Sequence, residues 1–155
     1  MQIQEKIPFK TRLKAVGLAL IGERLDAARV AMDQAQQAAN SEEKSSAGDK
    51  YETGRAMGHL QKEMYARQMG AYTRELSALH AVNTDQLYDS AVPGAVVDCG
   101  EVIFFIAAGL GKQEIGGRTI FFVAPQAPLA KQLAQLRSGG SLEFNKKTLI
   151  ILEVY

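Results

Sequence analysis

Two carboxylates, Asp49 and Glu52, lie three residues apart at the end of the short polar stretch 45–52, which also contains Gly48. Such a composition predicts a chain reversal, with a helix beginning near Asp49. Side chains three residues apart project from the same turn of a helix. Carboxylate oxygens are the ligands that Mg²⁺ takes from proteins, so this pair is the first candidate metal-binding group of the chain.

The same spacing also suits a purely structural role for the two acids. In a capping box, Asp49 accepts a hydrogen bond from the amide of Glu52, and Glu52 reaches back to the amide of Asp49. On spacing alone the cap is favoured. Two carboxylates are too few to hold Mg²⁺ by themselves, because the ion takes six oxygens and usually shares them with water and phosphate. The pair could, however, complete a metal site on another molecule.

The elements that position this pair are two predicted helices, over residues 11–40 and 49–82. In the first helix, apolar residues recur every seven positions, with a second set three positions later, which is the pattern of a helix packed against one partner. These positions are Leu18, Leu25, Met32 and Ala39, with Ile21, Ala28 and Ala35.

The second helix carries an upper and a lower apolar stripe. The upper stripe is Met57, Leu60 and Met64, and the lower stripe is Tyr65, Met69, Tyr72, Leu76 and Leu79. Only about eight residues join the helices, so we expect them to pack antiparallel. Each stripe is narrow, which favours a coiled-coil hairpin over two helices of an ordinary bundle. We therefore predict an N-terminal domain at 1–84, with an acidic tip near 41–52.

A second domain is predicted at 92–155, where the helical period gives way to that of strands. Strands are expected at 95–97, 102–107 and 119–124, and the glycines at 109–111 and 116–117 are interpreted as hairpin turns. A short helix is expected at 128–136, and a closing hairpin at 142–155 turns at 145–147. The fold class is therefore α+β: a helical hairpin followed by a small, mostly antiparallel β-domain with one short helix.

Composition excludes several classes of protein. The 155 residues are 46% hydrophobic and 23% charged, with a formal net charge of +1, so bulk charge does not predict a nucleic-acid or membrane partner. We expect no membrane span, no signal peptide and a cytoplasmic location. The single cysteine, Cys99, has no flanking basic residue and is not expected to be an activated thiol.

Two further groups have a structural and a functional interpretation. The cluster of Lys6, Lys10, Arg12 and Lys14 favours a solvated helix end, with a phosphate or protein contact as the alternative. The phenylalanines of the second domain are expected to form its core, with no aromatic-lined pocket. The apolar corner Ala127, Pro128 and Leu129 is the candidate partner-binding surface of this domain.

The tip sequence Gly48-Asp49-x-x-Glu52, at a turn between two long helices, resembles the tip of the bacterial Gre transcript-cleavage factors. Two segments of the second domain support the resemblance. Residues 122–133 resemble the family's run of strand, serine-proline and short helix, and residues 144–155 resemble its final strand. The similarity covers roughly residues 11 to 155.

The resemblance implies an FKBP-like second domain that docks on RNA polymerase and a coiled coil that enters the polymerase's secondary channel. By position, Asp49 and Glu52 match the two tip acids that help hold a catalytic Mg²⁺ while the polymerase hydrolyses backtracked RNA. The chain would then be a transcription elongation factor rather than an enzyme. It would have no cofactor of its own, would share Mg²⁺ with the polymerase, and would meet the RNA 3′ end only indirectly.

The tip departs from the family pattern after Glu52. The family continues with Asn-Ala-Glu-Tyr, whereas this chain continues with Thr53-Gly54-Arg55-Ala56. Arg55 lies three residues beyond Glu52 and could pair with it in competition with a metal. Two alternatives therefore stay open: a regulator that binds the channel without stimulating cleavage, and a coiled-coil adaptor unrelated to transcription.

Overall fold

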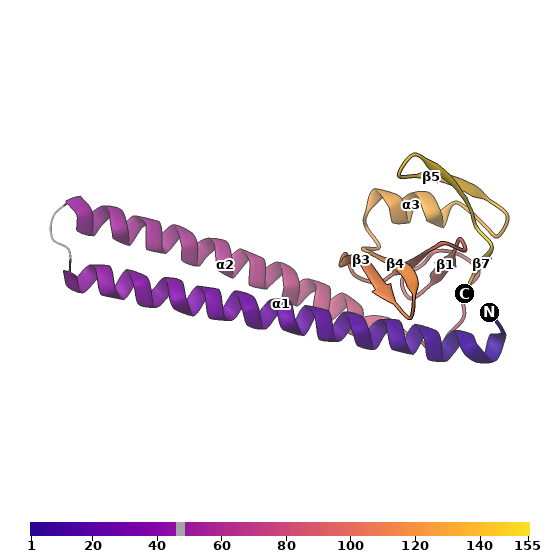
Figure 1. Cartoon of the computed structure of the whole chain (residues 1–155), viewed down its shortest axis with the longest axis horizontal. Coiled ribbons are helices and arrows are strands. Elements are labelled where there is room, and N and C mark those ends of the chain that lie inside the picture. The colour runs from indigo at the N-terminus through magenta and orange to yellow at the C-terminus, as the bar shows by residue number, and fades with distance from the viewer. Residues whose placement is uncertain (46–48) are drawn as a thin grey trace. The chain divides into compact units, whose positions relative to one another are not determined.

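The computed structural model describes the backbone of residues 1–45 and 49–155 and the side chains of residues 1–41 and 52–155. The fold is α+β. A pair of long packed helices, α1 (Ile3–Ser45) and α2 (Asp49–Ala81), precedes a small β-domain with one short helix, α3 (Pro128–Ala134) (Figure 1). The chain divides into two compact units, Leu20–Glu75 and Met1–Ala19 with Leu76–Tyr155.

Among the described residues, the unit Leu20–Glu75 consists of parts of α1 and α2 alone, which confirms a hairpin over a larger bundle. Ile21 and Ala28, two positions of the predicted heptad, are buried. A Cβ added at Gly58 would lie only 2.8 Å from the Cβ of Ala39, so the helices approach closely where the sequence provides small side chains. The antiparallel course of the two helices is visible in Figure 1.

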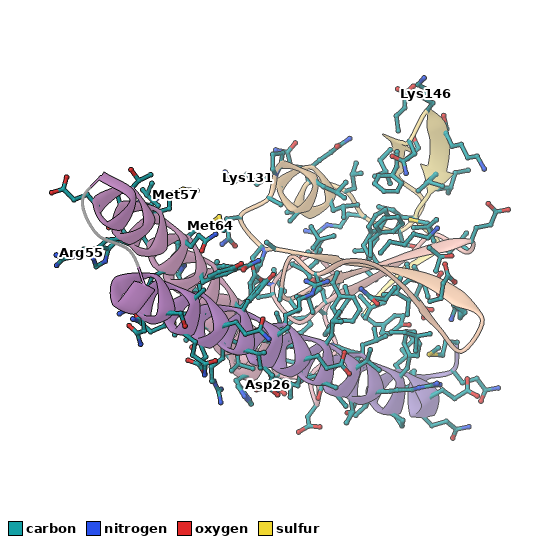
Figure 2. The ribbon with its side chains drawn as sticks, turned by 60° about the vertical axis from the view of Figure 1, so that its left-hand side comes forward. Asp26, Arg55, Met57, Met64, Lys131 and Lys146 are labelled. Carbon is teal, nitrogen blue, oxygen red and sulfur yellow. The ribbon has the colours of Figure 1, made fainter. Side chains whose placement is uncertain are left out.

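The upper stripe predicted for the second helix is wrong. Met57, Leu60 and Met64 are 58%, 66% and 56% exposed, and Figure 2 shows Met57 and Met64 projecting from α2. Gly54 and Gly58 occupy the seam instead and are half-buried. A glycine contributes almost nothing to an apolar count, so the predicted stripe was drawn through the larger side chains of Met57, Leu60 and Met64 instead.

The helix α1 begins well before the predicted start at residue 11 and includes Pro8 near its N-terminus. Pro8 is the sixth residue of α1 and lies beyond the first four amides that have no partner in a helix, so it removes one backbone hydrogen bond from α1. Leu13 and Gly17, in the part of α1 after Pro8, are buried. In the extra turns before residue 11, Lys10 is also buried and Phe9 is half-buried, so packing within the β-containing unit stabilises these turns.

The β-domain contains two sheets. A five-stranded sheet has the order β3-β4-β2-β1-β7, and a separate hairpin pairs β5 with β6. The strands are β1 (Val96–Asp98), β2 (Val102–Ile106), β3 (Gly111–Ile115), β4 (Arg118–Val123), β5 (Ser141–Phe144), β6 (Lys147–Ile150) and β7 (Glu153–Val154).

Three features of the sheets differ from expectation. β2 and β4 are parallel, whereas the other paired strands are antiparallel. β3 was not predicted, because Lys112, Gln113 and Glu114 make it polar, as an edge strand can be. The predicted closing hairpin divides, since β5 and β6 pair with each other while β7 joins β1 in the large sheet.

Both faces of the five-stranded sheet are covered within this unit. On one face, Phe104 and Ile106 share a buried cluster with Leu133 of α3 and Leu142 of β5. On the other face, a Cβ added at Gly17 of α1 would lie 3.0 Å from Cε2 of Phe122. The start of α1 is thus part of the core of the β-containing unit.

No helix in the described part of the chain is both long enough and apolar enough to span a membrane.

Candidate functional site

The predicted acidic tip is only partly described. Asp49 is the first residue of α2, but its side chain lies outside the described residues. Glu52 lies in the first turn of α2 and its side chain is exposed. Within the described side chains, Glu52 and Arg55 form no ion pair, although both are exposed. The carboxylate of Glu52 is therefore available to a ligand from solvent.

A complete metal site is not present among the described residues, where no three His, Cys, Asp or Glu side chains gather around one point. One exposed carboxylate suits a supplementary ligand to an ion held elsewhere, because Mg²⁺ tolerates water and few protein oxygens in its shell. The chemistry of Glu52 therefore fits a shared ion, while the contribution of Asp49 remains a prediction.

Of the three residues of the predicted partner-binding corner, one is exposed. Ala127 is the N-cap of α3, and Pro128 occupies its first turn, where a missing amide hydrogen is harmless. Pro128 is exposed, whereas Ala127 and Leu129 are partly buried against the core of the β-domain. The corner is thus rigid, but the apolar surface that it offers to a partner is centred on Pro128.

The lysines of the basic cluster in α1 are structural anchors, contrary to the predicted solvated helix end, whereas Arg12 is exposed. Lys10 is completely buried, and its Nζ donates to the carbonyl oxygen of Gln86 at 2.5 Å. Its ammonium group also lies 4.6 Å from the ring centre of Tyr88. Lys14 donates to the carbonyl oxygen of Val82 at 2.8 Å and so satisfies an acceptor just after α2.

The burial of Lys10 changes the pH at which its ammonium group loses a proton. Removal from water lowers the pKa of its ammonium group from 10.5 to about 8. The carbonyl of Gln86 and the ring of Tyr88 both favour the charged form and therefore oppose this effect. Lys10 therefore binds the segment after α2, and its ammonium group is not accessible to a phosphate.

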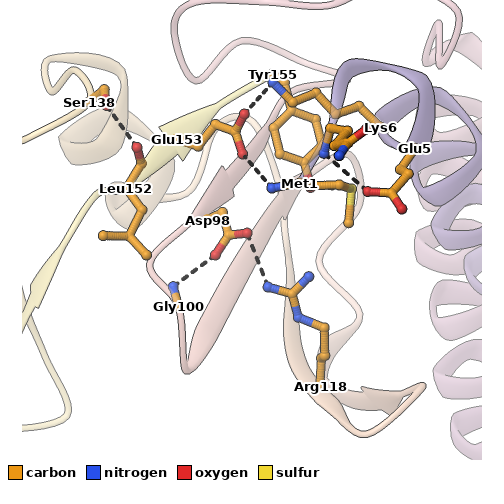
Figure 3. A network of polar contacts seen from close by, with 11 residues as sticks. Met1, Glu5, Lys6, Asp98, Gly100, Arg118, Ser138, Leu152, Glu153 and Tyr155 are labelled. Carbon is orange, nitrogen blue, oxygen red and sulfur yellow. Dashed lines mark hydrogen bonds and ion pairs between the residues drawn. The ribbon is translucent and has the colours of Figure 1, made fainter.

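A polar network joins both ends of the chain to the sheet (Figure 3). The carboxylate of Glu153 pairs with Lys6 and lies 3.6 Å from the amino terminus of Met1. The hydroxyl of Tyr155 donates to the sulfur of Met1 at 3.7 Å. Burial, reinforced by the charge of Asp98, raises the pKa of the Tyr155 hydroxyl above its usual range. These contacts join the first turns of α1 to the edge strand β7.

The buried acid of this network is Asp98, at the end of β1. Its Oδ2 accepts from Nη2 of Arg118 at 3.0 Å, and its Oδ1 accepts from the amide of Gly100 at 2.8 Å. Arg118 also stacks over Phe9 of α1, with its guanidinium carbon 5.7 Å from the ring centre. The group holds β1, β4 and α1 together and leaves no carboxylate oxygen without a partner.

Cys99 adjoins Asp98 and is half-buried. Burial, with a smaller contribution from the charge of Asp98, raises the pKa of its thiol to about 11. The thiolate is the nucleophilic form, so Cys99 is unreactive near neutral pH. The raised pKa agrees with the prediction that Cys99 is not an activated thiol.

The expectation that the β-domain has no aromatic-lined pocket is wrong, because a pocket lined by Phe121 and Phe144 opens beside the β5–β6 hairpin. Its volume is about 270 Å³. Its walls come from the large sheet and from the hairpin: Glu101, Val102, Lys112, Thr119, Phe121, Phe144, Asn145, Lys147 and Leu149. The phenylalanines lie far apart in the sequence, so only the pairing of the strands brings them together.

Comparison of the chain with protein-family models, with curated proteins and with solved structures finds no match.

Proposed function

We propose that this protein is a Gre-like factor that binds RNA polymerase, inserts its helical hairpin into the secondary channel and stimulates cleavage of backtracked RNA. The observation that carries the proposal is the order of elements: helices of 43 and 33 residues, packed antiparallel, are followed by a separate β-fold with one short helix. At about 1.5 Å per residue, α1 alone is roughly 65 Å long. A helix of that length suits an element that acts at a distance.

Glu52 and Asp49 would supply oxygen ligands to a Mg²⁺ ion shared with the polymerase. The exposure of Glu52 in the first turn of α2 supports this role. The ion, when bound, would supply the hydrolytic chemistry by activating water. The two carboxylates would hold and orient it, and the protein would contribute no nucleophile.

The β-domain at 92–155 would be the docking module, and we propose the FKBP-like assignment for it. A sheet of five strands with one short helix packed on one face supports the assignment. Pro128, exposed at the start of α3, would contact the polymerase together with Ala127 and Leu129. This module would set how the hairpin enters the channel.

The direct experiment is transcript cleavage in backtracked elongation complexes, with the wild-type protein compared with Asp49→Ala and Glu52→Ala. We expect cleavage with the wild type and a loss of on the order of 10- to 100-fold in each variant, the range seen when a group supporting a metal ion is removed. Glu63→Ala is the matched control, because Glu63 is an exposed acid of the same helix beyond the first turn. Unchanged cleavage in both tip variants would refute the metal role.

A second candidate function is a regulator that occupies the same channel without stimulating cleavage. The exposed Arg55 favours it, because this cation lies one turn from Glu52 and, although the two form no ion pair in the structure, it would compete with a metal ion if it turned toward the carboxylate. This alternative predicts polymerase binding and inhibition with no cleavage. If the protein instead retained no polymerase subunit in a pull-down, a coiled-coil adaptor outside transcription would be the better account.

A further inference from the structure

The pocket beside the β5–β6 hairpin, which we call the Phe121–Phe144 pocket, combines an aromatic wall with a basic rim. The ring centres of Phe121 and Phe144 are 4.9 Å apart, with planes at 78°. Phe144 also meets the fully buried Phe104 edge to face, at 5.1 Å and 88°. Phe121 and Phe144 are only half-buried, so part of this aromatic surface faces the pocket.

The register of the strands explains why the wall and the rim coincide. Lys112 of β3 is paired with Phe121 of β4, so both side chains lie on the same face of the sheet. Lys147 begins β6 opposite Phe144, where the hairpin turns through Asn145. Two lysines from two separate sheets therefore line one pocket.

Positive charge is concentrated at this pocket. Lys112 and Lys147 line it against a single acid, Glu101, so its nine lining residues carry the same net charge of +1 as the whole chain of 155 residues. Within the described residues, the ion partner of Lys112 is the exposed Glu114 at 3.9 Å, and Lys147 has none. Contacts between exposed charges of this kind are weak, so both ammonium groups remain available to an incoming carboxylate.

The position of the pocket favours a peptide over a free small molecule. Its volume of about 270 Å³ lies near the lower end of the roughly 300–1,000 Å³ typical of small-molecule sites and suits a single ring. The strand that carries Lys112 is an edge of the five-stranded sheet, and an edge strand can hydrogen-bond an extended peptide. An aromatic ring stacks well against the edges of other aromatic rings.

We propose that the Phe121–Phe144 pocket binds one aromatic side chain from an acidic, extended segment of a partner protein. The ring occupies the space between Phe121, Phe144 and Leu149, and flanking carboxylates face Lys112 and Lys147. This binding site lies in the β-domain, involves neither the tip nor Pro128, and does not depend on the proposed role in transcription.

The test is a titration of the full-length ¹⁵N-labelled protein with three capped pentapeptides, followed by NMR. The sequences are Asp-Asp-Phe-Asp-Asp, Asp-Asp-Ala-Asp-Asp and Lys-Lys-Phe-Lys-Lys. We expect the first peptide to shift the amide signals of Lys112, Thr119, Phe121 and Lys147, and to bind at least about tenfold more tightly than either of the others. Equal binding of the alanine peptide, shifts confined to other surfaces, or no binding by the first peptide would each overturn the proposal.

Substitutions of the rim lysines, Lys112 and Lys147, distinguish peptide binding in this pocket from nonspecific attraction of an acidic peptide to a basic surface. Lys112→Gln and Lys147→Gln should each weaken binding of the acidic phenylalanine peptide by about two- to fivefold. Lys131→Gln, at an exposed lysine of α3 outside the pocket, is the matched control and should leave binding unchanged. The double variant Lys112→Glu with Lys147→Glu should prefer the lysine peptide, and an unaltered preference would contradict the assignment.

Discussion

Asp98 and Arg118 form a half-buried ion pair on which three elements converge. The acid is 6% exposed and accepts hydrogen bonds from both Arg118 and the amide of Gly100, as Figure 3 shows. Breaking such a pair from one side is costly, because the remaining charge loses its partner while it stays out of water.

We expect Asp98→Asn to lower the free energy of unfolding by about 1–3 kcal/mol. Asp89→Asn is the matched control, because Asp89 pairs with Arg137 at 3.7 Å while almost fully exposed, and its loss should change stability very little. Urea unfolding of both variants measures the difference. Equal effects at the two positions would contradict the structural role assigned to Asp98.

The pH dependence of the free energy of unfolding tests whether the ammonium group of Lys10 is buried. Because burial lowers its pKa to about 8, the folded protein releases this proton near pH 8, while the unfolded chain keeps it to about pH 10.4. Between these values the unfolded state binds more protons, so the contribution of Lys10 to the free energy of unfolding rises with pH.

The variant Lys10→Met removes this titration. We expect the wild type to gain roughly 1–3 kcal/mol relative to Lys10→Met between pH 7 and pH 10, measured by urea unfolding at each pH. Taking the difference between the two proteins cancels the titration of the other lysines and of Tyr155. A difference that stays constant across this range would show that Lys10 keeps an ordinary pKa and is not buried as described.

At the scale of the element, Gly22 and Gly58 of the helical hairpin differ in the space around them, although the sequence alone does not show the difference. A Cβ added at Gly58 would lie 2.8 Å from that of Ala39, whereas one added at Gly22 meets no atom within 4 Å. Gly22→Ala should therefore stabilise the protein by about 0.5–1 kcal/mol through helix propensity. Gly58→Ala should destabilise it by about 1–3 kcal/mol through overpacking.

Thermal unfolding followed by far-UV circular dichroism checks both variants of the hairpin. The same substitution in two helices of one hairpin should move the transition in opposite directions. If Gly58→Ala also stabilised the protein, the close approach of α1 and α2 at Ala39 would be wrong.

The two helices of the hairpin show which contacts a hydrophobic period in the sequence can predict and which it cannot. In the first helix, the heptad through Ile21 and Ala28 correctly located the buried face, because these side chains are themselves the contact. In the second helix, Gly58 makes the close contact with Ala39, and its lack of a side chain is what allows the approach. Hydrophobicity cannot report a contact made by small residues, so the exposed Met57 and Met64 were assigned to the seam.

The candidate sites could also be predicted only in part, because some of their residues are brought together by contacts between segments that are distant in the sequence. Glu52 could be located from its spacing to Asp49 and from the turn before it, because both signals are local. The Phe121–Phe144 pocket depends on the register of β3 with β4 and on the contact between two sheets, neither of which leaves a local pattern. Lys10 looks like a surface lysine in the sequence, and only the chain after α2 buries it.

At the scale of the whole molecule, the α+β order of a helical hairpin followed by a β-domain was predicted correctly from the change of period near residue 90. The domain limits 1–84 and 92–155 remain predictions. The compact units of the structure assign the first residues of α1 and the last of α2 to the β-containing unit. Contacts such as Lys14 with Val82 join segments distant in sequence, and a hydrophobic period contains no signal for them.

The central claim is that the protein offers carboxylates to a Mg²⁺ ion that it cannot hold alone. The most direct measurement is the rate of RNA cleavage in backtracked complexes as a function of Mg²⁺ concentration, for the wild type, Glu52→Gln and Glu63→Gln. We predict that Glu52→Gln needs a higher Mg²⁺ concentration for half-maximal cleavage, while Glu63→Gln follows the wild type. A Glu52→Gln curve that coincides with the wild-type curve at every Mg²⁺ concentration would contradict the account.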